Sequence, residues 1–237
     1  NNIAMANVCS VPFTFIFHRG QGIKIFSLVA KQCKKDGFLI PVVKMDKKNP
    51  VTEGYEGACV LPPKKGIYLD DAVSVLDYAS LYPSSMIAEN LSHDTLVQID
   101  GPYDNLPGFE YVNITYSVGD FDVVNRYAQF PNGEKGVLPR ILMNLLKARK
   151  ETRARIKTEP NAFKRSTLNG QQLAYKVTAN SLYGQCGAST SQISLKPIAA
   201  STTAVGRQML HFAKDFVLEN YKDAEIVYGD TDSNYVS

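Results

Sequence analysis

Long stretches of the chain carry apolar side chains at the three- and four-residue spacing of an amphipathic α-helix. In 201–221 the apolar stripe consists of Val205, Met209, Phe212 and Phe216. The segments with this spacing are predicted as helices, and they are 22–35, 138–157, 162–183 and 201–221. Each is long enough to bury one side against the rest of a globular fold.

The second and third of these helices are separated only by the break around Pro160. So short a connection predicts an antiparallel helical hairpin. Gly184 is expected to end the hairpin's second helix, because glycine readily takes the left-handed conformation found after helix ends.

Shorter apolar runs bounded by turn residues predict β-strands. They are 58–61, 66–69, 73–77, 111–116, 126–130, 225–228 and 234–236. The run 73–77 ends in Asp77 and is predicted to be a buried strand. Helices and strands are thus both predicted, and the chain has no internal repeat.

Composition narrows the class of protein. The 237 residues are 44% hydrophobic and 21% charged, with a mean hydropathy of −0.17. These are ordinary values for a globular chain, and no apolar run approaches the ~20 residues of a membrane span. The four cysteines are scattered without a C-x-x-C pair, which favours reduced thiols over a zinc site.

Charge is distributed unevenly along the chain. The formal net charge is +3, but 140–176 holds ten Lys and Arg against two acids. That segment therefore carries +8 and the remainder −5. A strongly basic element on a mildly acidic body indicates a polyanionic partner, such as nucleic acid or nucleotide phosphates. The alternative is a basic helix face that only contacts solvent.

The first candidate for chemistry is the segment DYASLYPS at 77–84. Asp77 ends a predicted strand, and a carboxylate in that position is held rigidly beside a cleft. The backbone N–H groups of the turn that follows could bind a phosphate. The alternative is an ordinary helix start with Asp77 as its cap.

The second candidate is the acidic turn YGDTDS at 228–233. In an extended chain Asp230 and Asp232 point the same way. Two carboxylates so close repel unless a cation lies between them, and Mg²⁺ prefers such oxygen ligands. The alternative is an Asp-rich hairpin turn without a bound metal.

The third candidate is the basic face of the predicted hairpin. Arg149 and Arg153 are one helical turn apart, and Lys176, Asn180 and Tyr183 share a face of the next helix. Several cationic donors on one side match a triphosphate. Together with the acids, they predict two-metal phosphoryl transfer.

These segments resemble the motifs of the family B DNA polymerases, nearest to the delta-like and large-DNA-virus members. DYASLYPS at 77–84 resembles the first catalytic motif, KVTANSLYG at 176–184 the fingers motif, and YGDTDS at 228–233 the second catalytic motif. LLKARK at 145–150, with Arg153, resembles the triphosphate-binding helix. The match covers essentially the whole chain.

The resemblance implies the fold class α+β, with a palm, an antiparallel sheet with packed helices, that is interrupted by a helical-hairpin fingers subdomain. The implied parts are a segment linking an upstream exonuclease region to the palm at 1–49, the palm at 50–136 and 188–237, and the fingers at 137–187. The chain is then expected to be an internal piece of a larger polymerase and poorly active by itself.

The resemblance also implies residue roles. Two Mg²⁺ ions, with Mn²⁺ as a substitute, would be held by Asp77, Asp232 and the backbone carbonyl of Tyr78, with Asp230 in support. The implied dNTP contacts are Ser80, Leu81, Tyr82, Arg149, Arg153, Lys176, Asn180 and Tyr183. Tyr82 would exclude a 2′-hydroxyl. The implied template contacts are Tyr55, Gly57 and Gly184.

The implied activity is template-directed DNA synthesis from dNTPs on a primed DNA template. A sliding clamp and accessory subunits would be further partners, no membrane is involved, and the implied location is the nucleus or a cytoplasmic replication site of an infected cell. Two positions depart from the family pattern: Arg153 stands where lysine is usual, and Ala58 replaces the second glycine of a Tyr-x-Gly-Gly motif.

Two other functions remain open from the residues alone. A two-metal nuclease or phosphatase would explain the acids but not the basic hairpin. A catalytically inactive nucleic-acid-binding module would explain the charge but not the three aspartates. Nucleotide incorporation, strand cleavage and Mg²⁺ titration in the presence of dNTP separate these alternatives.

Overall fold

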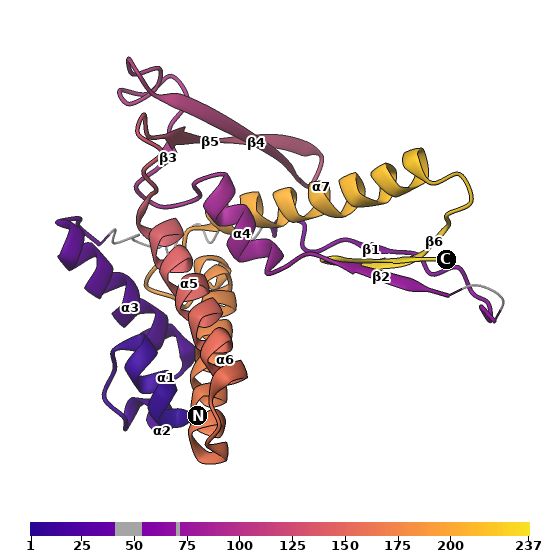
Figure 1. Ribbon diagram of the computed structural model, residues 1–237. Helices are drawn as coiled ribbons and strands as arrows, with labels where there is room; N and C mark the ends of the chain where they lie inside the picture. Colours follow the sequence, from indigo (N-terminus) through magenta and orange to yellow (C-terminus); the bar gives the residue numbers. More distant parts are fainter. Residues whose placement is uncertain (41–53, 70–71) are drawn as a thin grey trace.

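The computed structural model describes residues 1–40, 54–69 and 72–237. A bundle of helices carries two separate sheets, which project from it in different directions (Figure 1). The helices are α1 (Asn2–Cys9), α2 (Phe15–His18), α3 (Gln21–Asp36), α4 (Leu81–Ala88), α5 (Val137–Thr158), α6 (Ala162–Gly187) and α7 (Lys196–Asn220). The strands are β1 (Val60–Leu61), β2 (Ser74–Asp77), β3 (Leu96–Val97), β4 (Glu110–Val118), β5 (Phe121–Gln129), β6 (Ile226–Asp230) and β7 (Ser233–Val236).

The four predicted helices are confirmed as α3, α5, α6 and α7, and α5 packs against α6 as the predicted hairpin. The predicted stop at Gly184 is wrong, because α6 continues to Gly187. The extra turn buries Cys186, whose carbonyl accepts a hydrogen bond from the Leu195 N–H. Tertiary packing therefore outweighs the helix-ending tendency of glycine.

Both sheets are antiparallel, with strand orders β1-β6-β7-β2 and β3-β5-β4. Two predictions about strands are wrong. The run 66–69 is not a strand, and β2 is exposed along its whole length rather than buried. The second error has a simple cause: β2 is an edge strand that pairs with β7, whereas α7 covers β6 and β7.

The main core lies where α3, α4, α5, α6 and α7 meet β4 and β5. Tyr127, Leu142, Leu182 and Ile198 are fully buried there. The Tyr127 hydroxyl donates to the Ser201 Oγ at 3.0 Å, so the phenol is paired inside the core. This packing fixes the hairpin against α7 and the β3-β5-β4 sheet.

A buried polar junction sets where α5 begins. Asn90 has a φ of 56° and is completely buried. Its Nδ2 donates to the Ala128 carbonyl at 2.9 Å, and its Oδ1 accepts from the Gly136 N–H at 2.7 Å. One side chain thus ties the end of α4 to β5 and to the start of α5.

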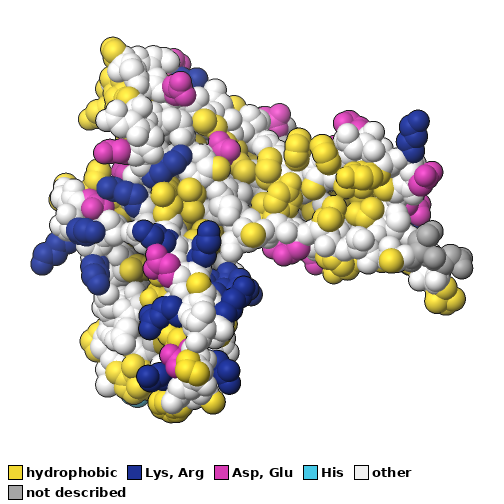
Figure 2. All heavy atoms as spheres, viewed as in Figure 1, with side chains coloured by type: hydrophobic (Ala, Val, Ile, Leu, Met, Phe, Trp, Pro, Cys, Tyr) yellow, Lys and Arg dark blue, Asp and Glu magenta, His cyan; other side chains and the backbone are white. Residues whose placement is uncertain are grey.

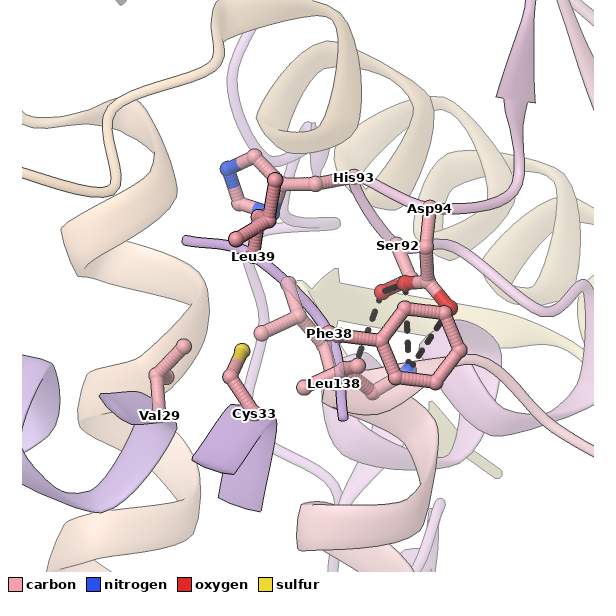
Figure 3. A pocket seen from close by; sticks show the side chains of 9 residues that line it. Val29, Cys33, Phe38, Leu39, Ser92, His93, Asp94 and Leu138 are labelled. Atoms are coloured by element: carbon pink, nitrogen blue, oxygen red, sulfur yellow. Dashed lines mark hydrogen bonds between the residues drawn. The ribbon is translucent and has the colours of Figure 1, made fainter. Parts of the chain in front are cut away.

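The first turn of α5 is capped from the same loop. The Asp94 carboxylate accepts from the Val137 N–H at 3.1 Å, and the Ser92 Oγ accepts from the Leu138 N–H at 3.1 Å (Figure 3). A negative charge at this end also complements the helix dipole. A Cβ at Gly136 would lie 2.8 Å from the Ser92 side chain, so the loop and the helix can approach this closely only with glycine there.

The N-terminal helices lie along the α5–α6 hairpin (Figure 1). Arg140 of α5 pairs with Asp36 at 3.2 Å and stacks over the Phe38 ring at 5.5 Å. A cavity of about 110 Å³ remains at this contact, between Cys33 of α3 and Leu138 of α5 (Figure 3). Residues 41–49 of the expected linking segment 1–49 lie outside the described residues.

We expect Asn90→Ala to lower the free energy of unfolding by about 2–5 kcal/mol. The substitution leaves the Ala128 carbonyl and the Gly136 N–H buried without their partner. Denaturant unfolding of the two proteins measures the difference. Asn132→Ala, in an exposed turn, is the matched control and should change stability by about 0.5 kcal/mol or less. Equal losses in both variants would contradict the role of Asn90.

Candidate active site

The acidic turn between β6 and β7 is tight and tied to a third strand. Thr231 has a φ of 55°, and the Asp232 N–H donates to the Asp230 carbonyl at 2.6 Å. The Thr231 N–H donates to the Cys59 carbonyl at 3.0 Å, which links the turn to the chain beside β1. The backbone therefore presents Asp230 and Asp232 from a fixed hairpin.

Asp77 lies beside this turn. In the sheet Asp77 pairs with Ser233, and Ser233 pairs on its other side with Asp230. Directly opposed residues point to the same face, so these three side chains share one face of the sheet. The Tyr78 N–H donates to the Asp232 carbonyl at 2.8 Å and closes the same corner.

The carboxylates influence one another electrostatically. Partial burial raises the pKa of Asp232, and the negative charges of Asp77 and Asp230 raise it further. The Lys176 ammonium acts in the opposite direction. Asp230 is held by hydroxyl groups, because its carboxylate accepts from Thr231 at 2.8 Å and from Tyr228 at 3.4 Å.

The charge of these carboxylates suits a divalent cation, but the number of side chains available to bind it is small. Burial and the charge of Asp77 raise the pKa of Asp232, and a cation beside these two carboxylates would favour their charged forms. Across the described ranges, however, no group of three or more His, Cys, Asp or Glu side chains is arranged to hold a metal. The donors that this corner offers are aspartate carboxylates, of the oxygen type that Mg²⁺ prefers.

The segment after Asp77 turns sharply into α4. Ser80 has a φ of 57° at the N-cap, and Leu81 and Tyr82 form the first turn. Pro83 lies in the same turn, where its missing N–H costs no helical hydrogen bond. Since the first N–H groups of a helix have no partner within it, 80–82 can offer backbone donors beside the acids.

Three tyrosines from three parts of the chain meet beside these acids. The rings of Tyr82 and Tyr183 are 4.7 Å apart, and Tyr183 forms a hydrogen bond with Tyr55. Burial, followed by Tyr55 and Tyr82, raises the pKa of Tyr183. Burial also raises the pKa of Tyr82, which lies close enough to Asp232 and Asp230 to be affected by their charges. We call these residues the tyrosine cluster.

The basic face of the hairpin leads toward this cluster. Lys176 and Asn180 are exposed on the face of α6 that also carries Tyr183. The Arg149 Nε donates to the Gln172 Oε1 at 3.4 Å, one helical turn before Lys176. Arg153 is exposed one turn farther along α5, and Figure 2 shows Lys and Arg side chains gathered over the hairpin.

The expected template contacts are divided between two places. Tyr55 is part of the tyrosine cluster, and the Gly57 carbonyl is held by Arg207. Gly184 is exposed on α6, with open space where a Cβ would lie. Ala58 does not have a positive φ, so replacing the family's second glycine causes no backbone strain there.

Sequence reasoning missed the contribution of α7 to this site. Thr203, Gly206 and Arg207 contact Glu56, Tyr82 or Gly57. In the sequence they stand within an amphipathic helix, and no motif distinguished them from its other polar and small residues. Their role is visible only when the segments around 55 and 82 are placed on α7.

A sequence model for DNA polymerase family B matches residues 11–237. The chain belongs to the family B DNA polymerases. It is 51% identical to a DNA polymerase of Pyramimonas orientalis virus over all of this chain and 24% of that protein. It is 40% identical to the DNA polymerase delta catalytic subunit of Candida albicans, over 98% of this chain and 22% of that protein.

The fold agrees with this membership. The structure matches a family B DNA polymerase from Pyrobaculum calidifontis with a TM-score of 0.73 and 29% sequence identity, over all of this chain and 28% of that one. The chain thus spans about a quarter of the length of the curated relatives that it matches. Within the described ranges, no helix is both long and apolar enough to cross a membrane.

We expect Lys176→Met to raise the pKa of Asp232 further in the absence of divalent cations, because the ammonium favours the charged carboxylate. Asp77→Asn should lower the same pKa by removing a negative neighbour. Carboxyl NMR titration measures both shifts. Lys164→Met, at the far end of α6, is the control and should leave Asp232 unchanged.

The upward shift of the Asp232 pKa also affects how the stability of the fold depends on pH. A folded pKa above the unfolded value means that ionisation of Asp232 opposes folding at neutral pH. This opposition is relieved as the pH falls through the folded pKa.

In the NMR titration, the same pKa for Asp232 in wild type, Lys176→Met and Asp77→Asn would show that these groups do not interact.

Proposed function

We propose that this chain forms the polymerising centre of a DNA-directed DNA polymerase, which adds dNMP units from dNTPs to a primer 3′-hydroxyl on a DNA template. One observation carries the proposal. Asp77, Tyr82 and Lys176 come from distant segments, and all three lie close enough to Asp232 for charge to couple them. Membership of the family supports the same activity.

In this proposal Asp77, Asp232 and the backbone carbonyl of Tyr78 hold two Mg²⁺ ions, which Mn²⁺ can replace, and Asp230 supports them. When bound, the ions neutralise charge on the transferring phosphoryl group and on the attacking and leaving oxygens. The chain's own contribution is to hold the acids in fixed positions. The paired strands β2, β7 and β6 do this through the backbone.

The basic hairpin face would bind the triphosphate. Lys176 lies close enough to Asp232 for its charge to lower the pKa of that carboxyl, and Arg149 and Arg153 extend the positive charge along α5. The backbone donors of Ser80 and Leu81 would add hydrogen bonds at the start of α4. Binding the leaving phosphates in this way stabilises charge that develops during transfer.

The tyrosine cluster would form the floor of the nucleotide pocket. The ring of Tyr82 would lie against the deoxyribose and exclude a 2′-hydroxyl, while Asn180 and Tyr183 would face the nascent base pair. Tyr55, Gly57 and Gly184 would contact the template. The ring pair of Tyr82 and Tyr183 supports this role, because it presents a rigid apolar surface beside the acids.

The proposed subdomains follow from these roles. Residues 50–136 and 188–237 would form the palm and 137–187 the fingers, and 1–49 would lead to an exonuclease region. A sliding clamp and accessory subunits are the further partners, and replication in the nucleus or in a cytoplasmic site of an infected cell is the setting.

In a full-length polymerase carrying this sequence, Asp77→Asn and Asp232→Asn should each lower primer extension by about 10³-fold or more. The reason is that each removes a charge aimed at the transferring phosphoryl group. Single-nucleotide incorporation with Mg²⁺ measures the loss. Asp223→Asn, on an exposed turn, is the matched control and should retain wild-type rates. Strand cleavage without incorporation in the wild type would contradict the proposal.

Tyr82→Ala in the same polymerase should keep dNTP incorporation within about tenfold of wild type but admit rNTPs far more readily. The change in discrimination should amount to a few kcal/mol, since the ring no longer fills the space of the added hydroxyl. Ratios of kcat/KM for a dNTP and its rNTP measure it. A melting curve gives the control, because loss of a core ring would instead lower stability by about 3–5 kcal/mol.

A further inference from the structure

We propose that Gly206 and Arg207 of α7 are positioning residues for the nucleotide pocket: Gly206 seats the Tyr82 ring, and Arg207 clamps the segment that delivers Tyr55. The inference rests on the proposed function and extends it to a helix outside the three sequence motifs. It makes sugar selection depend on α7 as well as on Tyr82.

Gly206 and the Tyr82 ring are in unusually close contact. A Cβ at position 206 would lie 2.7 Å from the Tyr82 Cε1 and 3.3 Å from its Cδ1. The same ring has Tyr183 as its aromatic neighbour, with ring centroids 4.7 Å apart. Real Cβ atoms do not approach another carbon to 2.7 Å. Any residue larger than glycine at position 206 must therefore displace the Tyr82 ring.

Arg207 fixes the neighbouring segment. Its guanidinium donates to the carbonyls of Glu56 and Gly57, both at 2.7 Å, and pairs with the Glu56 carboxylate at 3.2 Å. Thr203 adds a hydrogen bond to the Glu56 carbonyl at 2.9 Å. Only 13% of the Arg207 side chain is exposed, whereas its partner Glu56 is 62% exposed, so the clamp lies at the surface with the arginine largely covered.

The clamp acts directly on the cluster, because Tyr55 precedes Glu56. The Tyr55 hydroxyl lies against Gly187 of α6, where a Cβ would overlap it. The Arg207 charge also reaches Tyr82. Gly206 and Arg207 therefore hold two of the three rings from one turn of α7.

The same helix also supports the acids. The Tyr78 hydroxyl donates to the Met209 carbonyl at 3.1 Å, and the Asn234 Nδ2 donates to the Leu210 carbonyl at 3.2 Å. Residues 206–210 thus contact both the tyrosine cluster and the strands that carry the aspartates. This common support explains how α7 can set the ring positions relative to the reacting phosphate.

The test uses Gly206→Ala in a full-length polymerase carrying this sequence. Single-nucleotide primer extension gives kcat and KM for a dNTP and for the matching rNTP. We expect the dNTP/rNTP ratio of kcat/KM to fall about tenfold, because a ring displaced by a fraction of an ångström no longer excludes the hydroxyl. An unchanged or increased ratio would overturn the role of Gly206.

A double variant separates positioning from packing. If Gly206 acts through the Tyr82 ring, Gly206→Ala should change the ratio by less than about twofold in a Tyr82→Ala background, where the contact is gone. The double variant should also melt at or above the temperature of Gly206→Ala alone. A tenfold fall that persists without the Tyr82 ring would overturn the mechanism.

Arg207 is tested independently by Arg207→Lys, which keeps the charge but lacks the planar fork whose Nη1 contacts the two carbonyls while Nη2 pairs with the Glu56 carboxylate. We expect KM for dNTP to rise about fivefold or more with kcat within about twofold. Gln208→Ala, exposed on the same helix, is the control and should match wild type. Wild-type KM in Arg207→Lys would overturn the clamp.

Different results would contradict the proposed function and the roles of Gly206 and Arg207. A wild-type polymerase that does not extend primers would defeat the proposed function itself. A wild type that extends primers, and loses sugar selection on Tyr82→Ala but not on Gly206→Ala, would defeat only the present inference.

Discussion

The buried amide of Asn90 is the constraint on which the arrangement of the molecule depends. It satisfies a carbonyl of β5 and an N–H at the start of α5 at once, from a backbone position with positive φ. A buried polar group stabilises only one geometry well, because any other leaves its partners unpaired. The start of α5 is therefore fixed relative to α4, and α6 returns along α5 to bring Lys176 to the acids.

Positive and negative charges lie on different parts of the fold, the α5–α6 hairpin and the β6–β7 turn. The hairpin segment 140–176 carries ten Lys and Arg side chains against two acids, and at the β6–β7 turn burial together with the charges of Asp77 and Asp230 raises the pKa of Asp232. Lys176 offsets part of this shift. The protein thus concentrates negative charge at one corner of a sheet, and such a corner attracts a cation.

Much of the fold could be predicted because long helices leave a periodic pattern and the family motifs are local in sequence. The acids, Tyr82 and Lys176 were predicted as site residues in this way. The predictions that failed depended on what covers a segment. The apolar stripe of α7 is buried at Val205, but Phe212 is 61% exposed and Phe216 51% exposed. Likewise β2 is apolar and lies uncovered at a sheet edge.

Gly206 and Arg207 could not be identified, since their partners lie far away in the sequence and only tertiary contact reveals them.

The close contact between Gly206 and Tyr82 also has an evolutionary meaning. Two positions separated by more than half of the chain share one small volume, so neither can change size independently of the other. A lineage that relaxes its sugar specificity by shrinking residue 82 gains freedom at residue 206. A lineage that keeps the tyrosine loses every alternative to glycine there. The contact therefore predicts that the sizes of residues 82 and 206 change together among related polymerases.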